Sequence, residues 1–252
     1  MSYHPQPRFL DNKTILVTGA GDGIGKTAAI EYARFGATVV LLGRTVSKLE
    51  QVYDEIKALN LAEPGIAPMD LATASMDDMQ ELANVILDNY GKLDGLVHNA
   101  AILGDRVPFE HYDMNTWLRV MQINFNAACL LTRILLPAIQ QAPEATVIFT
   151  STGVGKIPRA YWGAYSVSKY ALEGFAMLLA DELENTSKIS VNILNPGATR
   201  TDMRRAAYPN ENPAELKSAE ELMPLYLYLM SQDSQENGET FTMDWFRTGT
   251  SN

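Results

Sequence analysis

The sequence predicts a doubly wound α/β fold, in which a seven-stranded parallel sheet is flanked by helices on both faces. Short apolar runs alternate with helical segments along almost the whole chain of 252 residues. Several of these runs, such as Val39-Val40-Leu41-Leu42, are continuously apolar, as expected of strands that helices cover on both faces. The chain shows no interdomain linker and no internal repeat, so we expect a single domain over residues 1–252.

Each element is assigned from its apolar pattern, with short apolar runs for strands and helical spacing for helices. The expected strands are residues 14–18, 38–42, 66–69, 95–98, 147–150, 190–194 and 239–243. The expected helices are about residues 26–35, 47–59, 76–90, 115–139, 163–185 and 220–230. One long loop-like stretch, about residues 199–218, follows the sixth strand. Ligands of such sheets bind beyond the carboxyl ends of the strands, so this stretch is predicted to be a substrate lid.

The composition limits the class of protein. The formal net charge is −10, and no Lys/Arg-rich run is present, so we expect no nucleic-acid and no membrane partner. The N-terminal segment has no signal-peptide core, and no apolar run is long enough to span a membrane, which predicts a cytoplasmic protein. The one cysteine, Cys129, can form no internal disulfide, and the three scattered histidines predict no metal site.

A glycine-rich loop follows the first expected strand. Residues 18–25 read Thr-Gly-Ala-Gly-Asp-Gly-Ile-Gly, and a helical pattern begins directly after them. Glycines let the backbone approach a pyrophosphate, while the free N–H groups and the dipole of the helix favour the anion. The alternative interpretation is an ordinary tight turn between a strand and a helix.

A tyrosine and a lysine lie four residues apart in the expected helix 163–185. Residues at this spacing share one face of a helix, so the phenol of Tyr165 and the ammonium of Lys169 are expected side by side. A fixed positive charge favours the phenolate and lowers the pKa of the phenol. The pair can then donate or accept a proton during the interconversion of an alcohol and a carbonyl.

The glycine loop, followed much later by Tyr-x-x-x-Lys in a chain of this size, resembles the short-chain dehydrogenase/reductase family. The resemblance covers nearly the whole chain, from about residue 13 to 243, and is greatest to a bacterial branch whose substrates are unassigned. Four further motifs agree with those of the family in order. They are Asp70-Leu71 after the third strand, Asn99-Ala100-Ala101 after the fourth, Asn124 in the fourth helix, and Pro196-Gly197 with Thr199 and Thr201 after the sixth strand.

The resemblance implies a Rossmann fold and a nicotinamide-dependent oxidoreductase that interconverts an alcohol and a carbonyl by hydride transfer. Tyr165 would be the general acid or base, and Lys169 would lower its pKa and bond the nicotinamide ribose. Asn124 would kink its helix and hold a water for proton relay, and a hydroxyl from Ser151 or Thr152 would orient the substrate oxygen. The implied cofactor-binding residues are Gly19, Gly21, Asp22, Gly23, Ile24, Gly25, Arg44, Asp70, Leu71, Asn99, Ala100, Ala101, Tyr165, Lys169, Pro196, Gly197, Thr199 and Thr201.

The sequence departs from the family pattern at three positions. The family's catalytic serine lies thirteen residues before the tyrosine, where this chain has Thr152, and Ser151 precedes it. Strand alternation places adjacent side chains on opposite faces, so only one of these hydroxyls should face Tyr165, and we favour Thr152. Ala101 replaces the usual glycine, and Asp22 stands where enzymes that use the phosphorylated cofactor often have a basic residue.

The residues after the second strand bear on the choice of cofactor. Where a carboxylate would bond the ribose 2′-hydroxyl of NAD(H), this chain has Gly43, and Arg44 follows with a planar fork suited to phosphate. Asp22 is a source of repulsion, but one solvated carboxylate should be outweighed by a bidentate arginine. We therefore predict a preference for NADP(H), with NAD(H) as the second cofactor.

Two alternative functions require other features than an oxidoreductase does. A nucleotide-binding sensor or scaffold that lacks turnover would not need the combination of Asn124, a hydroxyl, Tyr165 and Lys169. An extended-family epimerase or dehydratase would usually be longer, with an added substrate domain. The substrate is expected to be a small carbonyl or alcohol in a partly aromatic pocket near Ile157, Tyr161 and Trp162. Helices 115–139 and 163–185 commonly pair across a two-fold axis in the family, which implies a homodimer or homotetramer.

Overall fold

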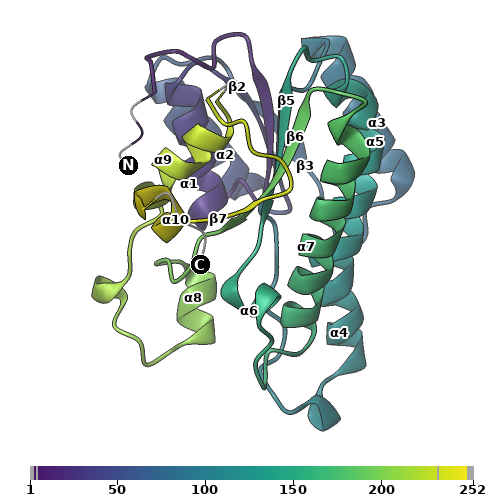
Figure 1. The fold of residues 1–252 in the computed structure, drawn as a ribbon, viewed down its shortest axis with the longest axis vertical. Helices are drawn as coiled ribbons and strands as arrows, with labels where there is room; N and C mark the ends of the chain where they lie inside the picture. The colour runs from purple at the N-terminus through teal and green to yellow at the C-terminus, as the bar shows by residue number, and fades with distance from the viewer. Residues whose placement is uncertain (1–2, 4, 232, 249–252) are drawn as a thin grey trace.

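A computed structural model describes residues 3, 5–231 and 233–248 of the chain. The seven strands form one sheet in the order β3-β2-β1-β4-β5-β6-β7, and every neighbouring pair is parallel (Figure 1). The strands are β1 Thr14–Thr18, β2 Thr38–Gly43, β3 Gly65–Pro68, β4 Gly95–His98, β5 Ala145–Thr150, β6 Ile189–Asn195 and β7 Thr240–Thr242. The predicted doubly wound α/β fold is confirmed, and each expected strand is present within two residues at either end.

Helices cover both faces of the sheet. The α-helices are α1 Gly23–Arg34, α2 Val46–Ala58, α3 Met76–Tyr90, α4 Met114–Met121, α5 Ala127–Ile139, α6 Gly153–Lys156, α7 Gly163–Glu184, α8 Asp202–Ala207, α9 Met223–Leu229 and α10 Met243–Thr248. Helices α1, α2, α9 and α10 lie on one side of the sheet, and α3, α4, α5 and α7 lie on the other (Figure 1). Side chains from each set form a separate hydrophobic cluster against the strands.

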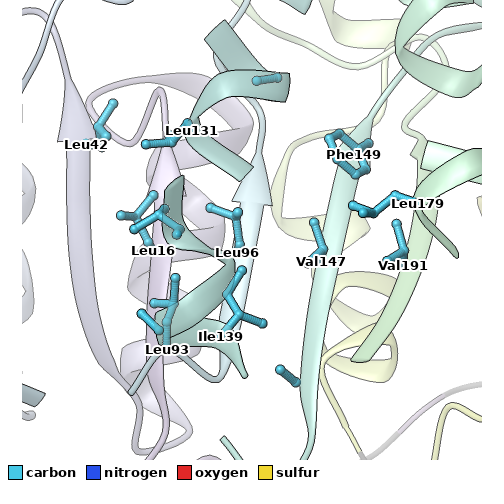
Figure 2. Close-up of a cluster of buried hydrophobic side chains, with 14 of the residues drawn as sticks. Leu16, Leu42, Leu93, Leu96, Leu131, Ile139, Val147, Phe149, Leu179 and Val191 are labelled. Carbon is cyan, nitrogen blue, oxygen red and sulfur yellow. The ribbon is translucent and has the colours of Figure 1, made fainter. Parts of the chain in front are cut away.

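Strand alternation divides the core between these two clusters. In β1, Leu16 packs in the cluster with α3, α5 and α7, whereas Ile15 and Val17 pack in the cluster with α1, α2 and α9. Figure 2 shows the first cluster, where Leu96 and Phe149 point from the strands toward the covering helices. A strand with both faces buried in this way has to be apolar at every position, which explains the continuous apolar runs in the sequence.

The expected helix over residues 115–139 is divided into three segments. A π-helical turn, η2 Gln122–Asn126, separates α4 from α5. Asn124 lies in this turn, and its side-chain amide bonds the backbone of Ile102 in the loop after β4. The division therefore depends on a contact between distant segments, which the helical periodicity of the sequence does not contain.

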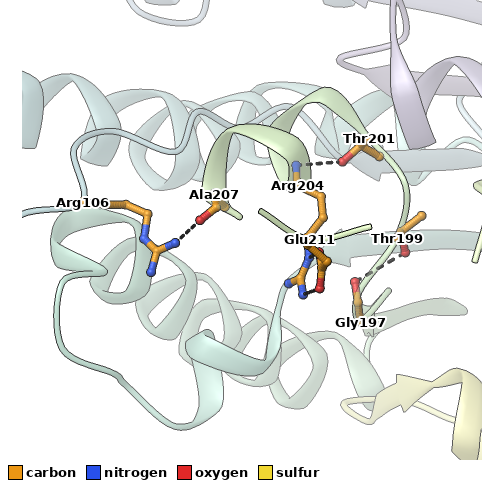
Figure 3. Close-up of polar contacts among 7 residues, drawn as sticks. All are labelled: Arg106, Gly197, Thr199, Thr201, Arg204, Ala207 and Glu211. Atoms are coloured by element: carbon orange, nitrogen blue, oxygen red, sulfur yellow. Dashed lines mark hydrogen bonds and ion pairs between the residues drawn. The ribbon is translucent and has the colours of Figure 1, made fainter. Parts of the chain in front are cut away.

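The stretch over residues 199–218 was expected to be a loop, and in this respect the expectation was wrong. It contains α8 and the 3₁₀ turn η3 Pro213–Glu215. Thr201 caps α8 by accepting a hydrogen bond from the backbone N–H of Arg204 at 3.1 Å (Figure 3). Two further 3₁₀ turns, η1 Phe109–His111 and η4 Glu220–Leu222, precede α4 and α9. Such short elements span too few residues for a periodic pattern to indicate them.

One stretch of the described chain has the length and hydropathy of a membrane-crossing helix. It spans Met114–Ile139, with a mean hydropathy of 1.2 in its most apolar window. Half of that window is buried inside the protein, where the stretch contacts α3 and α7. Its apolar composition is therefore accounted for by packing in the core.

Candidate functional site

A cavity of about 460 Å³ opens at the carboxyl edge of the sheet. Its walls come from the segments that follow β1 through β6, and it lies where the strand order reverses direction about β1. In doubly wound sheets this switch point is where ligands bind. The predicted residues that line the cavity are Gly19, Gly21, Asp22, Gly23, Ile24, Arg44, Asp70, Leu71, Asn99, Ala100, Ala101, Ser151, Thr152, Tyr165, Lys169, Pro196, Gly197, Thr199 and Thr201.

The glycine loop is held against the segment after β4. The hydroxyl of Thr18 accepts hydrogen bonds from the backbone N–H groups of Asn99 and Ala100, both at 3.0 Å. Gly19 has φ +68°, and a Cβ on it would lie 3.0 Å from the Cα of Ala100. A side chain at this position would therefore strain the backbone and fill the space between the two loops.

Gly25 is the one predicted glycine that does not line the cavity. A Cβ on Gly25 would lie 2.3 Å from the carbonyl oxygen of Gly19 and 2.5 Å from the side-chain Nδ2 of Asn99. Its role in this structure is to let α1 pack closely on the glycine loop, which brings the first turn of the helix to the cavity.

The first turn of α1 provides a place for an anion. Asp22 caps the helix through a 2.7 Å hydrogen bond from the N–H of Gly23, which leaves other N–H groups of the turn facing the loop. Together with the glycine cradle, this helix N-terminus fits the pyrophosphate of a dinucleotide. The residues present therefore fit a nicotinamide cofactor.

Positive charge gathers beside the loop after β2. Arg44, which is exposed, and Lys48 both line the cavity there. Lys48 forms an ion pair with Asp22, and this bond holds the pKa of the Asp22 carboxyl below its usual value. A Cβ on Gly43 would lie 3.1 Å from Leu49, so a longer side chain would require Leu49 to move. The charge of Asp22 is thus paired, which the sequence alone did not indicate.

Tyr165 lies in the first turn of α7 and is only 7% exposed. Burial raises the pKa of the Tyr165 phenol to about 12, and a hydrogen bond with the side chain of Thr152 opposes this increase. The sequence predicted a lowered pKa from the neighbouring ammonium. In this structure that prediction is wrong, because burial raises the pKa and the group that opposes the increase is Thr152, not Lys169. The phenol therefore keeps its proton at neutral pH.

Lys169 is 2% exposed, and its Nζ donates a 2.7 Å hydrogen bond to the carbonyl oxygen of Thr150 at the end of β5. Burial lowers the pKa of Lys169 to about 8, and the negative charge of Glu173 opposes the decrease. The Glu173 carboxylate, one turn further along α7, accepts a hydrogen bond from the hydroxyl of Ser151. Glu173 was not identified from the sequence, although its spacing from Lys169 is the same as that between Tyr165 and Lys169.

The side chain of Asn124 does not line the cavity. Its Oδ1 accepts a hydrogen bond from the N–H of Ile102 at 2.8 Å, and its Nδ2 donates to the carbonyl of Ile102 and to the hydroxyl of Ser168. The side chain is 1% exposed and fully engaged in these bonds. It therefore holds the loop after β4 against α7 and fixes the π-helical turn beside the cavity.

Apolar side chains surround Tyr165 at one end of the cavity. Leu103, Trp162, Met203 and Ala207 line this end, and the rings of Trp162 and Tyr165 lie 5.7 Å apart. The sequence identified Trp162 but also suggested Ile157 and Tyr161, which are 68% and 56% exposed and do not line the cavity. The backbone of Tyr161 adopts φ +69°.

One bond ties the segment 199–218 to the loop after β4, and another stabilises the segment internally (Figure 3). Arg106, in the loop after β4, donates a hydrogen bond to the carbonyl oxygen of Ala207. Arg204 makes a bidentate ion pair with Glu211 inside the segment, with two contacts of 2.6 Å. Among the residues that the structure describes, no group of three or more His, Cys, Asp or Glu side chains is placed to hold a metal ion.

Comparison with known proteins identifies close relatives. The family model described as short chain dehydrogenase matches residues 13–212. The Uncharacterized oxidoreductase YciK of Escherichia coli (strain K12) is 46% identical over 242 residues, which cover 96% of this chain and 95% of the relative. A solved structure from Pseudomonas syringae, described as a candidate short chain dehydrogenase, is 46% identical with a TM-score of 0.94, covering 96% of this chain and 98% of the other. Another from Escherichia coli CFT073, complexed with NADPH, is 47% identical with a TM-score of 0.92, covering 94% and 99%.

Proposed function

This chain belongs to the short-chain dehydrogenase family of oxidoreductases, and from that premise we propose that it interconverts an alcohol and a carbonyl with NADP(H) as cofactor. The observation that carries the proposal is that Tyr165 and Lys169 line the same cavity as the glycine loop, with Thr152 bonded to the phenol. A nucleotide cradle and a proton donor in one enclosed space are what a coupled hydride and proton transfer requires.

In the reductive direction, the cofactor would supply, when bound, a hydride to the carbonyl carbon of the substrate. Tyr165 would donate its proton to the carbonyl oxygen, so that the new C–H bond comes from the hydride and the new O–H bond from the phenol. The high pKa of the buried phenol keeps the proton available at neutral pH. Thr152 bonds the phenol and would also bond the substrate oxygen. Lys169, which lines the same cavity, would stabilise the phenolate left behind. Oxidation of the alcohol uses the same groups in reverse.

The adenosine end of the cavity supports NADP(H) as the preferred cofactor. Arg44 and Lys48 bring two positive charges beside the loop where a ribose 2′-phosphate would lie, and Gly43 brings no carboxylate. Arginine and lysine both bond phosphate, and the pairing of Asp22 with Lys48 reduces the repulsion from the glycine loop. The NADPH present in the similar Escherichia coli protein supports the same choice for this chain.

We assign the whole of residues 1–252 to one catalytic domain and residues 199–218 to a lid over the substrate. The bonds from Arg106 to Ala207 and from Arg204 to Glu211 support a lid that is ordered in the closed position. Exposed apolar side chains on α4 and α7, among them Leu118, Tyr170 and Met177, support association of two or more copies through these helices. The protein is proposed to act in the cytoplasm on a small molecule.

The test is a panel of ketones, aldehydes and secondary alcohols assayed with NADPH, NADP⁺, NADH and NAD⁺. The proposal predicts turnover of at least one carbonyl with NADPH, and a higher kcat/KM with NADPH than with NADH. Tight NADPH binding without turnover across the panel would instead favour a nucleotide-binding sensor. Stronger binding of NADH than of NADPH would refute the cofactor choice.

A further inference from the structure

The end of the cavity beside Tyr165 has a distinct chemical character. We call it the substrate compartment and define it by Leu103, Thr152, Trp162, Tyr165, Met203 and Ala207, all of which line the cavity. Val154 and Tyr208 pack behind these residues in the same small hydrophobic cluster. The hydroxyls of Thr152 and Tyr165 are bonded to each other and are placed to serve the reacting oxygen. The rest of the compartment is apolar or aromatic, and its one other polar side-chain group is the indole N–H of Trp162.

The guanidinium of Arg204, next to this compartment, is already paired with a carboxylate. Arg204 follows Met203 and lines the cavity, but its Nε and Nη2 each donate to a carboxylate oxygen of Glu211 at 2.6 Å. Its guanidinium also lies 3.8 Å from the ring centroid of Tyr208. An arginine that is paired bidentately and stacked on an aromatic ring offers little to a second anion.

Arg106 is a second arginine near the compartment, and it does not line the cavity. Its guanidinium lies 4.3 Å from the ring centroid of Trp162 and 5.1 Å from that of Tyr208, so it packs against both rings. It also donates a hydrogen bond to the carbonyl oxygen of Ala207. Its Nε is buried without a hydrogen-bond partner, and Arg106 is not among the residues that line the cavity. Arg106 therefore fixes Trp162 against the compartment.

We infer that the substrate is an uncharged carbonyl compound, or the matching alcohol, whose apolar body packs on Trp162, Leu103 and Met203. An anionic group placed there would lose its hydration, while the two cations that line the cavity nearby are already bonded, Arg204 to Glu211 and Lys169 to the carbonyl oxygen of Thr150. The lost hydration would therefore go uncompensated, which is unfavourable. An apolar group would instead gain from the removal of its surface and of the aromatic wall from water. This inference rests on the proposed function, because the compartment is defined by the reacting hydroxyl of Tyr165.

The experiment compares two probes that share one carbonyl and one ring. Acetophenone is uncharged, and 4-acetylbenzoate differs from it by a single carboxylate. Their dissociation constants are measured by titration calorimetry against the full chain saturated with NADP⁺, so that binding is followed without reduction of either probe. We expect acetophenone to bind at least about tenfold more tightly, which corresponds to about 1.4 kcal/mol.

Variants locate the binding at the compartment. Trp162→Ala should weaken acetophenone binding by about tenfold while the dissociation constant of NADP⁺ stays within about twofold, which also shows that the variant is folded. Ile157→Ala is the matched control, because Ile157 lies nearby in sequence but is exposed and outside the cavity. It should leave both dissociation constants unchanged.

Three results would overturn the inference. The first is binding of 4-acetylbenzoate that is as tight as that of acetophenone or tighter. If Arg106→Leu then abolished the binding of 4-acetylbenzoate, Arg106 would be identified as the residue that binds the carboxylate. The second is binding of neither probe by a protein that binds NADP⁺, which would leave the proposed oxidoreductase function standing. The third is acetophenone binding that Trp162→Ala does not change. Failure to bind NADP⁺ at all would instead refute the proposed function itself.

Discussion

The hydroxyl of Ser151 donates a hydrogen bond to the carboxylate of Glu173. Its neighbour Thr152 has the side chain that bonds the phenol of Tyr165. The two residues follow β5 directly, and adjacent side chains of an extended strand point to opposite sides. The hydroxyl of Ser151 is therefore committed to the carboxylate near Lys169, while the hydroxyl of Thr152 faces the proposed reaction centre.

This relationship predicts different consequences for two substitutions. Thr152→Val removes a hydrogen-bond donor at the reacting oxygen and should lower kcat/KM for a carbonyl by about 10²-fold. Ser151→Ala should lower it by less than about tenfold, because that hydroxyl acts on Glu173. Thr152→Ser keeps the hydroxyl and should restore most of the activity. Steady-state kinetics of the three variants decide the matter, and a larger loss in Ser151→Ala than in Thr152→Val would reverse the assignment.

Glu173 should control the alkaline limit of activity. Lys169 is an ammonium below its pKa of about 8, so a function that needs this charge is lost as the pH rises through that value. Glu173 opposes the decrease that burial causes, so Glu173→Gln should lower the pKa of Lys169 further and move the loss of activity to lower pH. The other titratable groups nearby are Tyr165, which keeps its proton in this range, and His98, which is neutral.

The measurement for this prediction is the pH profile of kcat/KM for NADPH, which reports ionisations of the free enzyme. Lys156 also acts on Glu173, lowering the pKa of its carboxyl, and this lysine is unchanged in Glu173→Gln. Glu182→Gln, an exposed carboxylate on the same helix, is the matched control and should leave the profile unchanged. An alkaline limb that does not move in Glu173→Gln, or that moves to higher pH, would contradict the prediction.

Cofactor preference should depend on Arg44, Lys48 and Asp22. Arg44→Ala and Lys48→Met should each weaken NADPH binding by about 10- to 100-fold, as expected for a lost hydrogen bond to an ionised phosphate, and should leave NADH binding nearly unchanged. Asp22→Asn keeps a side chain that can cap α1, removes the negative charge and frees Lys48, so it should tighten NADPH binding. Fluorescence titrations with both cofactors test this. Equal losses for NADPH and NADH would place these residues outside the 2′-phosphate site.

His98 should make the fold sensitive to acid. It is buried, stacks on Phe149 and bonds Thr132, and burial lowers its pKa from 6.5 to about 3. The unfolded chain therefore binds a proton that the native protein does not, so stability present above pH 6.5 is lost as the pH falls toward 3, by about 1.4 kcal/mol per pH unit.

His98→Gln removes this titration and keeps a group that can bond Thr132. Between pH 7 and pH 5, the free energy of unfolding should therefore decrease by about 2 kcal/mol less in the variant than in the wild type. Urea unfolding at the two pH values measures the difference. Each protein is compared with itself at the two pH values, so a difference in overall stability between variant and wild type does not matter. An equal decrease in the free energy of unfolding in both proteins would contradict the lowered pKa of His98.

Local sequence signals were sufficient for most of the fold. Helix α3 was predicted with its observed bounds, because Ser75 and Asp78 form a reciprocal cap at its start and Gly91 follows its end with φ +73°. The central strands β1, β4 and β5 were recognisable because they are buried along their whole length. The π-helical turn at Asn124 was not predictable, since it depends on bonds to Ile102 across the fold.

Most of the residues that line the cavity were predictable, but Asn124 and Gly25 lie outside it and the electrostatics were not predictable. The glycine loop follows a strand, and Tyr165 and Lys169 share one helix face, so the sequence placed both at the same edge of the sheet. The raised pKa of Tyr165 depends on burial, to which Met203 contributes from a distant segment after β6. The choice between Ser151 and Thr152 likewise required the position of Glu173 on α7.

The central claim is that Tyr165 supplies the proton in a reaction that uses NADPH. The most direct test compares the wild type with Tyr165→Phe, which removes the hydroxyl and little else, on a carbonyl that the wild type reduces. The account predicts that kcat falls by about 10²- to 10⁴-fold in the variant while the dissociation constant of NADPH stays within about twofold. Near-normal oxidation of NADPH by Tyr165→Phe on the same carbonyl would contradict it.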